Sequence, residues 1–159
     1  MRIIIEGCDK TGKSTLAKQL SERYNLPIIK VNQPKTEDSL IEYLELLKQN
    51  DNAIFDRLHL GENVYGPLYR NTNKIDFSGL ENMFKNNTLL ILCTDNHLNV
   101  QDRFISDKED YTKFEHIRYI LDEFKREYDK SILNKTTYNI GKYDMSMQRI
   151  LKKIEEEVK

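Results

Sequence analysis

Apolar residues follow two different spacings along this chain. Short runs rich in β-branched and other apolar residues occur at 2–6, 27–31, 53–56, 88–93 and 136–140, and runs of this length between polar segments are typical of buried strands. Between these runs, apolar positions recur every three or four residues, which predicts helices. Short strands that alternate with helices need crossover connections, so the pattern predicts an α/β fold with a five-stranded parallel sheet flanked by helices.

Two of the predicted helices have a clear apolar face. The first covers 112–131, with an apolar face of Phe114, Ile117, Ile120, Leu121, Phe124 and Tyr128. The second lies near the end of the chain, with an apolar face of Met147, Ile150, Leu151, Ile154 and Val158. We expect Asp144 or Ser146 to be its N-cap. No repeat or flexible linker interrupts the pattern, so we expect a single domain over residues 1–159.

Charge and composition exclude several classes of protein. The chain has 159 residues, of which 25 are Lys or Arg and 26 are Asp or Glu, so its formal net charge is −1. That balance argues against a protein that coats nucleic acid indiscriminately. No apolar run approaches the roughly 18 to 20 residues of a membrane span, and the first run meets Glu6 too early for a signal peptide. We therefore expect a soluble, cytoplasmic protein with no membrane partner.

Cysteine and histidine positions do not indicate a metal site. Cys8 and Cys93 lie far apart, with no CxxC and no nearby His pair, so we expect two reduced thiols rather than a disulfide or a structural zinc site. Three histidines, which also lack metal-ligand spacing, are expected at the surface or at an interface; they are His59, His97 and His116.

Residues 7–15 read GCDKTGKST and match the pattern GxxxxGK[ST] between a predicted strand and a predicted helix. Backbone N–H groups in such a loop surround phosphates, which requires unusual dihedral angles at Gly7 and Gly12. A helix that begins at Lys13 directs its dipole at the anion. We expect Lys13 to bridge the β- and γ-phosphates of ATP and Ser14 to hold Mg²⁺. The predicted nucleotide-binding residues are Gly7, Asp9, Lys10, Thr11, Gly12, Lys13, Ser14 and Thr15.

The third predicted strand ends in Asp56 and Arg57. A carboxylate at this place in a nucleotide-binding α/β fold reaches the metal or its water, so Asp56 is the second predicted metal ligand. The alternative is that Asp56 only caps the following helix. Arg57 is suited to bidentate capture of phosphate oxygens, on the donor or on an acceptor.

GTPase-like patterns occur at 73–79, where NKID is followed by DFSG. The two patterns share Asp76, stand in the wrong order and follow a polar run, so they cannot lie at two separate strand ends. We do not interpret them as a GTPase switch.

The chain resembles the thymidylate kinase and deoxynucleoside kinase superfamily of P-loop kinases in three segments that occur in the same order. They are IEGCDKTGKST, the FDR at 55–57 and a charged region with an arginine before the long helix. The resemblance covers most of the chain, implies the three-layer P-loop kinase fold and is compatible with a virus-encoded enzyme. It also implies that Asp9 lies near the acceptor and that Lys10 assists the transferred phosphoryl group. The alternative is that both are solvated loop charges.

The family pattern places a lid over the phosphates, and residues 102–112 occupy that position. Arg103 and Lys108 are its candidates for stabilising negative charge during transfer. The alternative is an exposed, self-neutralising loop. Lys10 is a stronger catalytic candidate than Arg103 because it supplies a cation from the P-loop itself. The predicted catalytic residues are Asp9, Lys10, Lys13, Arg57 and Arg103.

Residues 58–70 resemble the stretch that holds the acceptor's sugar and base in this superfamily. Two glycines and a proline interrupt helical periodicity there, and Tyr65, Tyr69 and Arg70 cluster. Aromatic faces for a base and an arginine for a phosphate suit an acceptor pocket. The alternative is that the tyrosines are half-buried beneath a loop. The predicted acceptor-binding residues are Asp56, Arg57, Tyr65, Tyr69 and Arg70.

The clearest departure from the family is Asn32-Gln33-Pro34 after the second predicted strand. Nucleoside kinases of the superfamily have a carboxylate there as general base, and thymidylate kinases have Arg-Glu-Pro. Without that carboxylate, Asp9 or Asp56 would have to serve as the base for a hydroxyl acceptor.

These observations favour an ATP- and Mg²⁺-dependent kinase for a small nucleotide acceptor, a deoxynucleoside monophosphate such as dTMP. One alternative is a hydroxyl acceptor: a nucleoside, a polynucleotide 5′ end or a hydroxymethylated base in DNA, and only this alternative involves nucleic acid. The other is a nucleotide-binding switch that transfers phosphate to water alone. The resemblance also implies a homodimer formed through helices on one sheet face.

Overall fold

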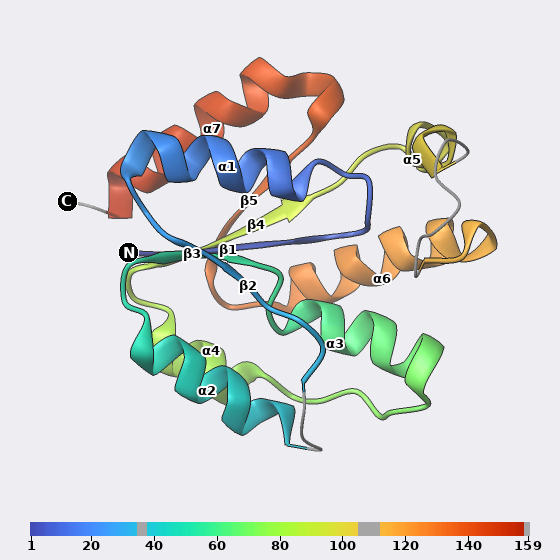
Figure 1. Ribbon diagram of the computed structural model, residues 1–159, viewed down its shortest axis with the longest axis horizontal. Helices are drawn as coiled ribbons and strands as arrows, with labels where there is room; N and C mark the ends of the chain where they lie inside the picture. Colours follow the sequence, from blue (N-terminus) through green and yellow to red (C-terminus); the bar gives the residue numbers. More distant parts are fainter. Residues whose placement is uncertain (35–37, 105–111, 158–159) are drawn as a thin grey trace.

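The computed structural model describes residues 1–34, 38–104 and 112–157. Its centre is a parallel sheet with the strand order β2-β3-β1-β4-β5 (Figure 1). The strands are β1 (Arg2–Gly7), β2 (Ile28–Lys30), β3 (Ala53–Asp56), β4 (Thr88–Cys93) and β5 (Asn134–Tyr138). The predicted α/β fold with a five-stranded parallel sheet is confirmed.

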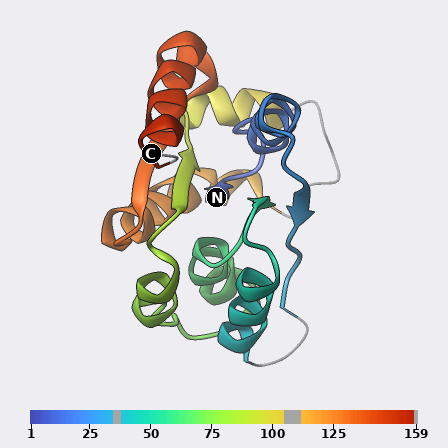
Figure 2. The same ribbon diagram turned by 90° about the vertical axis from the view of Figure 1, so that its left-hand side faces the viewer.

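Helices cover both faces of this sheet. One face carries α1 (Lys13–Tyr24) and α7 (Tyr143–Glu157); the other carries α2 (Ser39–Gln49), α3 (Leu60–Tyr65), α4 (Ser78–Phe84) and α6 (Ile117–Lys130). Figure 2 shows the same two layers after a quarter turn. The remaining elements are α5 (His97–Phe104) and three short turns, η1 (Gly66–Arg70), η2 (Phe114–His116) and η3 (Ile140–Lys142).

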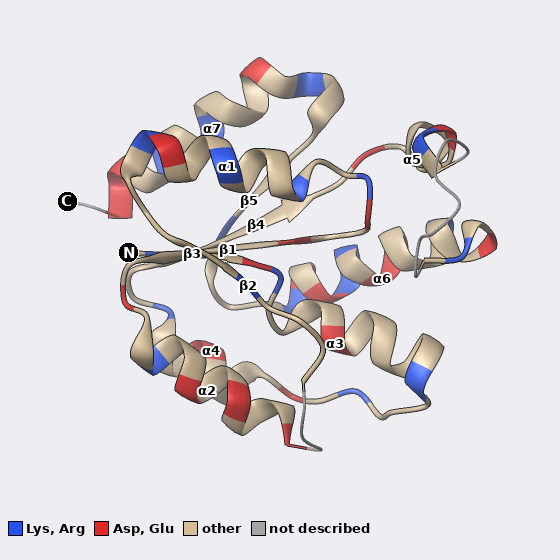
Figure 3. Ribbon diagram, viewed as in Figure 1, with Lys and Arg blue, Asp and Glu red and all other residues tan. Residues whose placement is uncertain are grey.

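The two sheet faces bury separate apolar clusters. Ile3 and Ile5 of β1 pack with Leu16, Leu20 and other residues beneath α1 and α7. The intervening residue, Ile4, belongs to the larger cluster on the opposite face, because successive side chains of a strand point to opposite sides. Figure 3 shows the resulting charge distribution: Lys, Arg, Asp and Glu lie mainly on helices and connecting segments, whereas the strands are largely uncharged. Among the described residues, no helix is both long and apolar enough to cross a bilayer.

The C-terminal elements differ from the prediction in their bounds. The last strand was expected at 136–140 but ends at Tyr138, because the Asn139 side chain accepts a hydrogen bond from Gly141 N at 2.8 Å and starts η3. Helix α7 already begins at Tyr143, so neither Asp144 nor Ser146 is its N-cap. The Ser146 hydroxyl is buried and accepts a hydrogen bond from Asn139 N at 3.1 Å.

Two further segments also differ from the prediction. The helix expected over 112–131 is preceded by the 3₁₀ turn η2 and begins at Ile117. The interrupted periodicity at 58–70 suggested a poor packing helix, but α3 runs directly into the π-helical turn η1. Pro67 lies in the first turn of η1, where the helix changes from α to π geometry.

Candidate active site

The P-loop joins β1 to α1 and has the predicted backbone geometry. Helix α1 begins at Lys13, and the glycines adopt positive φ angles of 141° at Gly7 and 88° at Gly12. A Cβ atom at Gly7 would lie 2.2 Å from the Cys93 carbonyl oxygen, so only glycine fits there. Lys10 also has a positive φ of 62°. The loop therefore turns its backbone as a phosphate cradle requires.

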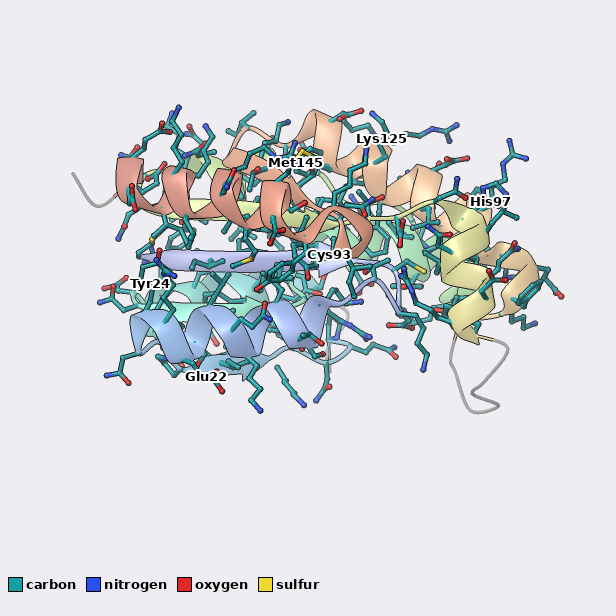
Figure 4. The ribbon with its side chains drawn as sticks, turned by 90° about the horizontal axis from the view of Figure 1, so that it is seen from above. Glu22, Tyr24, Cys93, His97, Lys125 and Met145 are labelled. Carbon is teal, nitrogen blue, oxygen red and sulfur yellow. The ribbon has the colours of Figure 1, made fainter. Side chains whose placement is uncertain are left out.

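Inside the P-loop, two side chains donate to the same carbonyl group. Thr11 Oγ1 lies 2.6 Å and Lys13 Nζ 2.7 Å from the Cys8 carbonyl oxygen. The Cys8 side chain is fully buried, and burial raises the pKa of its thiol to about 12. A thiol with this pKa is not a reactive thiolate at neutral pH, so Cys8 acts as a small spacer. Burial also raises the pKa of Cys93 to about 12; Figure 4 shows Cys93 beneath α1 and α7.

The two predicted metal ligands lie together. Ser14 Oγ donates a hydrogen bond to Asp56 Oδ2 at 3.1 Å. A hydroxyl and a carboxylate beside a phosphate cradle are oxygen ligands of the kind Mg²⁺ takes together with phosphates and water, so the pair fits this ion. Asp56 does not cap α3, whose N-cap is His59.

Asp9 connects three parts of the site. Its Oδ1 lies 2.5 Å from Arg57 Nη2 and 3.6 Å from Lys13 Nζ. Its Oδ2 accepts a hydrogen bond at 2.9 Å from Thr112 Oγ1, which precedes η2. The Asp9 side chain is 18% exposed, so Asp9 is not the solvated loop charge of the alternative interpretation. Arg57 adopts a positive φ of 73°, a strained conformation of the kind found at functional sites.

The Arg103 side chain contacts the backbone of the P-loop. Arg103 Nη1 donates to the Lys10 carbonyl at 2.9 Å, and Nη2 forms an ion pair with Asp95. Lys10 Nζ lies 6.0 Å from the centre of the Phe104 ring. Residues 102–104, expected in a lid, form the last turn of α5 because Val100 and Phe104 are buried along one helix face. The rest of the predicted lid at 105–111, including Lys108, lies outside the described residues.

Two adjoining cavities lie at the carboxyl ends of the strands. The phosphate-side cavity, of about 390 Å³, is lined by Asp9, Lys10, Gly12, Lys13, Ser14, Thr15, Lys30, Val31, Asn32, Asp56 and Arg57. The second, also about 390 Å³ and here called the acceptor cavity, is lined by Glu6, Asp9, Val31, Asn32, Gln33, Pro34, Tyr43, Arg57, Leu58, Gly61, Glu62, Tyr65, Arg70 and Phe124. The two cavities share Asp9, Val31, Asn32 and Arg57.

The acceptor cavity has aromatic and charged walls. Tyr65 is buried, stacks on Tyr69 with ring centres 6.1 Å apart, and meets Phe124 edge-on. Arg70 pairs with Glu62 at 2.7 Å. Tyr69, predicted to bind the acceptor, does not line the cavity; its hydroxyl accepts from Lys113 N at 3.0 Å. Four of the five predicted acceptor residues thus line at least one of the two cavities. The fifth, Tyr69, stacks on Tyr65.

Several lining residues were missed by the prediction or treated only as departures from the family. Lys30 extends from β2 into the phosphate-side cavity, and Asn32 and Gln33 line the acceptor cavity. Glu6 is fully buried in that cavity's wall. The available signal for Glu6 was an acid at the end of an otherwise apolar strand, immediately before the P-loop.

His59 is not a surface residue, contrary to the prediction. It is 1% exposed, and its Nε2 lies 2.8 Å from Glu81 Oε1. His97 and His116 are half-buried; His97 lies on α5, near the carboxyl ends of the strands (Figure 4). The GTPase-like residues 73–79 lie between η1 and α4, where Asp76 Oδ1 accepts a hydrogen bond from Ser78 N at 2.9 Å.

No protein-family model and no curated protein sequence matches the chain. Solved structures do match. YorR from Bacillus subtilis, solved with phosphorylated GDP, has a TM-score of 0.83 at 21% identity, over 98% of this chain and 96% of its own. Deoxyadenosine kinase from M. mycoides, solved with dCTP, has a TM-score of 0.67 at 17% identity, over 98% of this chain and 100% of its own. Shikimate kinase from Aquifex aeolicus has a TM-score of 0.58 at 18% identity, over 98% and 96%.

These structures agree with this chain in architecture at low sequence identity. They do not single out thymidylate kinases or a viral source, so the dTMP-like acceptor stays a prediction. The three-layer arrangement inferred from the family resemblance is confirmed: the chain has the fold of the P-loop kinases.

Proposed function

We propose that the protein is an ATP-dependent phosphotransferase that transfers the γ-phosphoryl group to a deoxynucleoside monophosphate, with dTMP as the first acceptor to test. The observation that carries this proposal is the junction of the two cavities at Asp9 and Arg57. A donor phosphate in the P-loop and an acceptor in the second cavity would meet there. Holding two reactants in this way is the main source of catalysis in phosphoryl transfer.

On the donor side, the P-loop backbone and the N-terminus of α1 bind the phosphates. Lys13 Nζ leaves the Cys8 carbonyl, to which it donates at 2.7 Å, and binds phosphate oxygens instead. Ser14 and Asp56 would hold Mg²⁺, which neutralises phosphate charge and orients the triphosphate. Arg103 holds the Lys10 carbonyl, which positions the Lys10 side chain near the transferred group.

On the acceptor side, both carboxylates near the junction already have partners. Asp9 pairs with Arg57 and Lys13, and Asp56 accepts a hydrogen bond from Ser14. A hydroxyl acceptor must lose its proton to a base, whereas an acceptor phosphate is already an anion. Arg57 at the junction provides a bidentate contact for that phosphate. A cavity of about 390 Å³ is in the size range of small-molecule sites.

A hydroxyl acceptor is the second candidate, and two observations favour it. The acceptor cavity has three acidic residues, Glu6, Asp9 and Glu62, against two arginines, which suits an uncharged nucleoside better than a phosphate dianion. The fold also resembles that of a deoxyadenosine kinase. This candidate includes deoxynucleosides, polynucleotide 5′ ends and hydroxymethylated bases in DNA.

One experiment separates these candidates. The purified protein is given Mg²⁺ with ATP or GTP, since YorR was solved with a guanine nucleotide. Consumption of the triphosphate is followed with deoxynucleoside monophosphates, deoxynucleosides and oligonucleotides with free 5′ hydroxyls. The Lys13→Ala variant, prepared in the same way, measures contaminating activity.

Each outcome has a definite meaning. Stimulation by monophosphates alone supports the first candidate, and stimulation by hydroxyl acceptors alone replaces it with the second. Triphosphate hydrolysis that no acceptor stimulates would instead indicate a nucleotide-binding switch.

A further inference from the structure

Glu6 is the last side chain of β1 before the P-loop, and it points to the acceptor side of the sheet. It lies two residues after Ile4, whose side chain packs in the cluster beneath α3 and α6, so both side chains share that face. Glu6 is 0% exposed, yet it lines the acceptor cavity together with Gly61 and Phe124. A charged side chain buried this deeply is rare without full pairing.

The two carboxylate oxygens of Glu6 have different surroundings. Oε1 accepts hydrogen bonds from Leu58 N and Leu60 N, both at 2.9 Å. These bonds satisfy backbone donors at the start of α3, which explains a structural role for one oxygen. Oε2 is also buried, and within the described part of the chain it accepts no hydrogen bond of normal geometry, although the nearby Gly61 N–H acts to lower the pKa of the carboxyl. It lies 3.6 Å from the place that a Cβ atom on Gly61 would take.

A structural anchor needs only Oε1, so the second oxygen requires another explanation. Leaving a buried carboxylate oxygen without a donor costs free energy. Burial raises the pKa of Glu6 above its usual range, against the opposing effects of His59 and nearby backbone N–H groups. An additional hydrogen-bond donor at Oε2 would therefore favour the ionised carboxylate.

We propose that Glu6 is a positioning residue of the acceptor cavity, and that its Oε2 accepts a hydrogen bond from an O–H or N–H group on the nucleoside part of the acceptor. This inference rests on the proposed function, because it takes the second cavity as the acceptor site. It assigns the cavity a fixed polar contact beside aromatic walls, the usual composition of a small-molecule site.

The test is the Glu6→Gln variant. Glutamine keeps an oxygen for Leu58 N and Leu60 N but replaces Oε2 with an NH₂ donor, which would face the donor group of the acceptor. We expect the KM for the acceptor to rise at least about tenfold, while kcat changes by less than about threefold and the KM for ATP is unchanged. The matched control is Glu81→Gln, which alters another buried carboxylate on the same face whose two oxygens both have partners. It should leave the acceptor KM unchanged.

Acceptor analogues identify the contact without depending on the variant's folding. The wild-type protein is compared with acceptors that lack the 3′ hydroxyl and with acceptors methylated at base N–H positions. One of these changes should weaken binding about tenfold in the wild type and much less in Glu6→Gln. If neither analogue binds more weakly to the wild type, the inference is wrong.

The remaining outcomes also distinguish the inference from the proposed function. An unchanged acceptor KM in Glu6→Gln overturns the inference while leaving the kinase assignment intact. A loss of kcat with an unchanged acceptor KM also overturns it, because Glu6 would then act on the reacting proton. Absence of wild-type turnover contradicts the proposed function. Titration calorimetry with deoxynucleosides and deoxynucleoside monophosphates then decides the inference separately, and a wild-type protein that binds none of them overturns it.

Discussion

Two regions on the same face of the sheet bury carboxylates in opposite ways. One is the acceptor cavity around Glu6. The other, which we call the paired cluster, consists of His59, Asn63, Lys74, Glu81, Glu123 and Glu127. In the paired cluster, Glu81 receives His59 Nε2 on one oxygen and Ile132 N on the other, each at 2.8 Å. Glu6 uses one oxygen twice and leaves the other without a donor.

The paired cluster satisfies its other carboxylates as well. Lys74 Nζ lies 2.6 Å from Glu123 Oε2 and 2.8 Å from Glu127 Oε1, and Asn63 Nδ2 donates to Glu127 Oε2 at 3.0 Å. Burial acts to raise the pKa of each of these glutamates, but their hydrogen bonds and cations outweigh it, so the pKa values lie below the usual range. The pKa of Glu6 is raised. Buried acids are common to both regions, and the difference between them is the second carboxylate oxygen of Glu6, on which the proposed ligand contact rests.

The largest expected effect is on activity alone, from Lys13→Ala. Loss of the ammonium group that contacts the transferred phosphate should lower kcat/KM at least about 1,000-fold, or about 4 kcal/mol of transition-state stabilisation. The thermal unfolding midpoint should stay within a few degrees of wild type, since the P-loop backbone geometry depends on Gly7 and Gly12. Steady-state kinetics and calorimetry measure the two quantities. Activity above about a tenth of wild type would contradict the P-loop assignment.

Arg57→Ala should reduce kcat/KM about 100-fold, or about 3 kcal/mol, by removing a phosphate contact at the junction of the cavities. The matched control is Arg126→Ala, which removes an exposed arginine paired with Glu123 and should leave kinetics unchanged. A fully active Arg57→Ala protein would show that the acceptor side has been assigned wrongly.

A substitution in the paired cluster should lower stability and leave activity unchanged. Lys74→Met leaves Glu123 and Glu127 buried with fewer cations, so the free energy of unfolding should fall by about 2 kcal/mol. The KM and kcat values of the folded protein should be unchanged, because Lys74 lines neither of the two cavities at the P-loop. Urea unfolding and steady-state kinetics on the same preparation measure both. A Lys74→Met protein with normal stability but altered kinetics would contradict this distinction between the two regions.

The pH dependence of stability should also differ in sign between the regions. Lowered pKa values mean that Glu81, Glu123 and Glu127 stabilise the fold above the usual pKa of glutamate, and that this contribution is lost as the pH falls through their lowered values. A raised pKa means that charged Glu6 opposes folding at neutral pH, and that this cost is relieved as the pH falls through its raised value.

Glu6→Gln should therefore raise the free energy of unfolding by about 1 kcal/mol at pH 8 in the absence of acceptor. The gain should shrink as the pH falls and wild-type Glu6 becomes protonated. Urea titrations between pH 4 and pH 8 provide the comparison, and a variant that is less stable at pH 8 would mean that Glu6 is purely structural.

The sequence predicted those elements whose structure depends on residues close together in the chain. Glycine positions and the helix start within residues 7–15 define the P-loop, and long apolar runs define β1 and β4. The last strand was placed two residues too late because β5 begins with the polar Asn134 and Lys135. Lys135 Nζ reaches the carbonyl groups of Tyr128 and Asp129 at the end of α6, a contact that no local pattern indicates.

Contacts between residues distant in sequence could not be predicted. Glu6 and Leu58 are 52 positions apart, and the burial of His59 depends on Glu81, which belongs to another helix. A single sequence shows neither pairing, so Glu6 was seen only as an early charge and His59 as a surface residue. The P-loop part of the candidate site could be predicted from local sequence pattern. The residues around the acceptor cavity are brought together only by tertiary structure.

The smallest expected effect tests the longest of these contacts, the hydrogen bond from Thr112 Oγ1 to Asp9 Oδ2 across 103 positions. Thr112→Val should lower kcat/KM about fivefold, or about 1 kcal/mol, because Asp9 would keep Arg57 but lose the donor that orients its second oxygen. The matched control is Thr88→Val: the Thr88 hydroxyl is buried and has no hydrogen-bond partner within the described residues. This control should keep full activity and gain stability slightly, since valine removes an unsatisfied polar atom. Equal kinetics in the two variants would separate Thr112 from the site and leave Asp9 oriented by its cations alone.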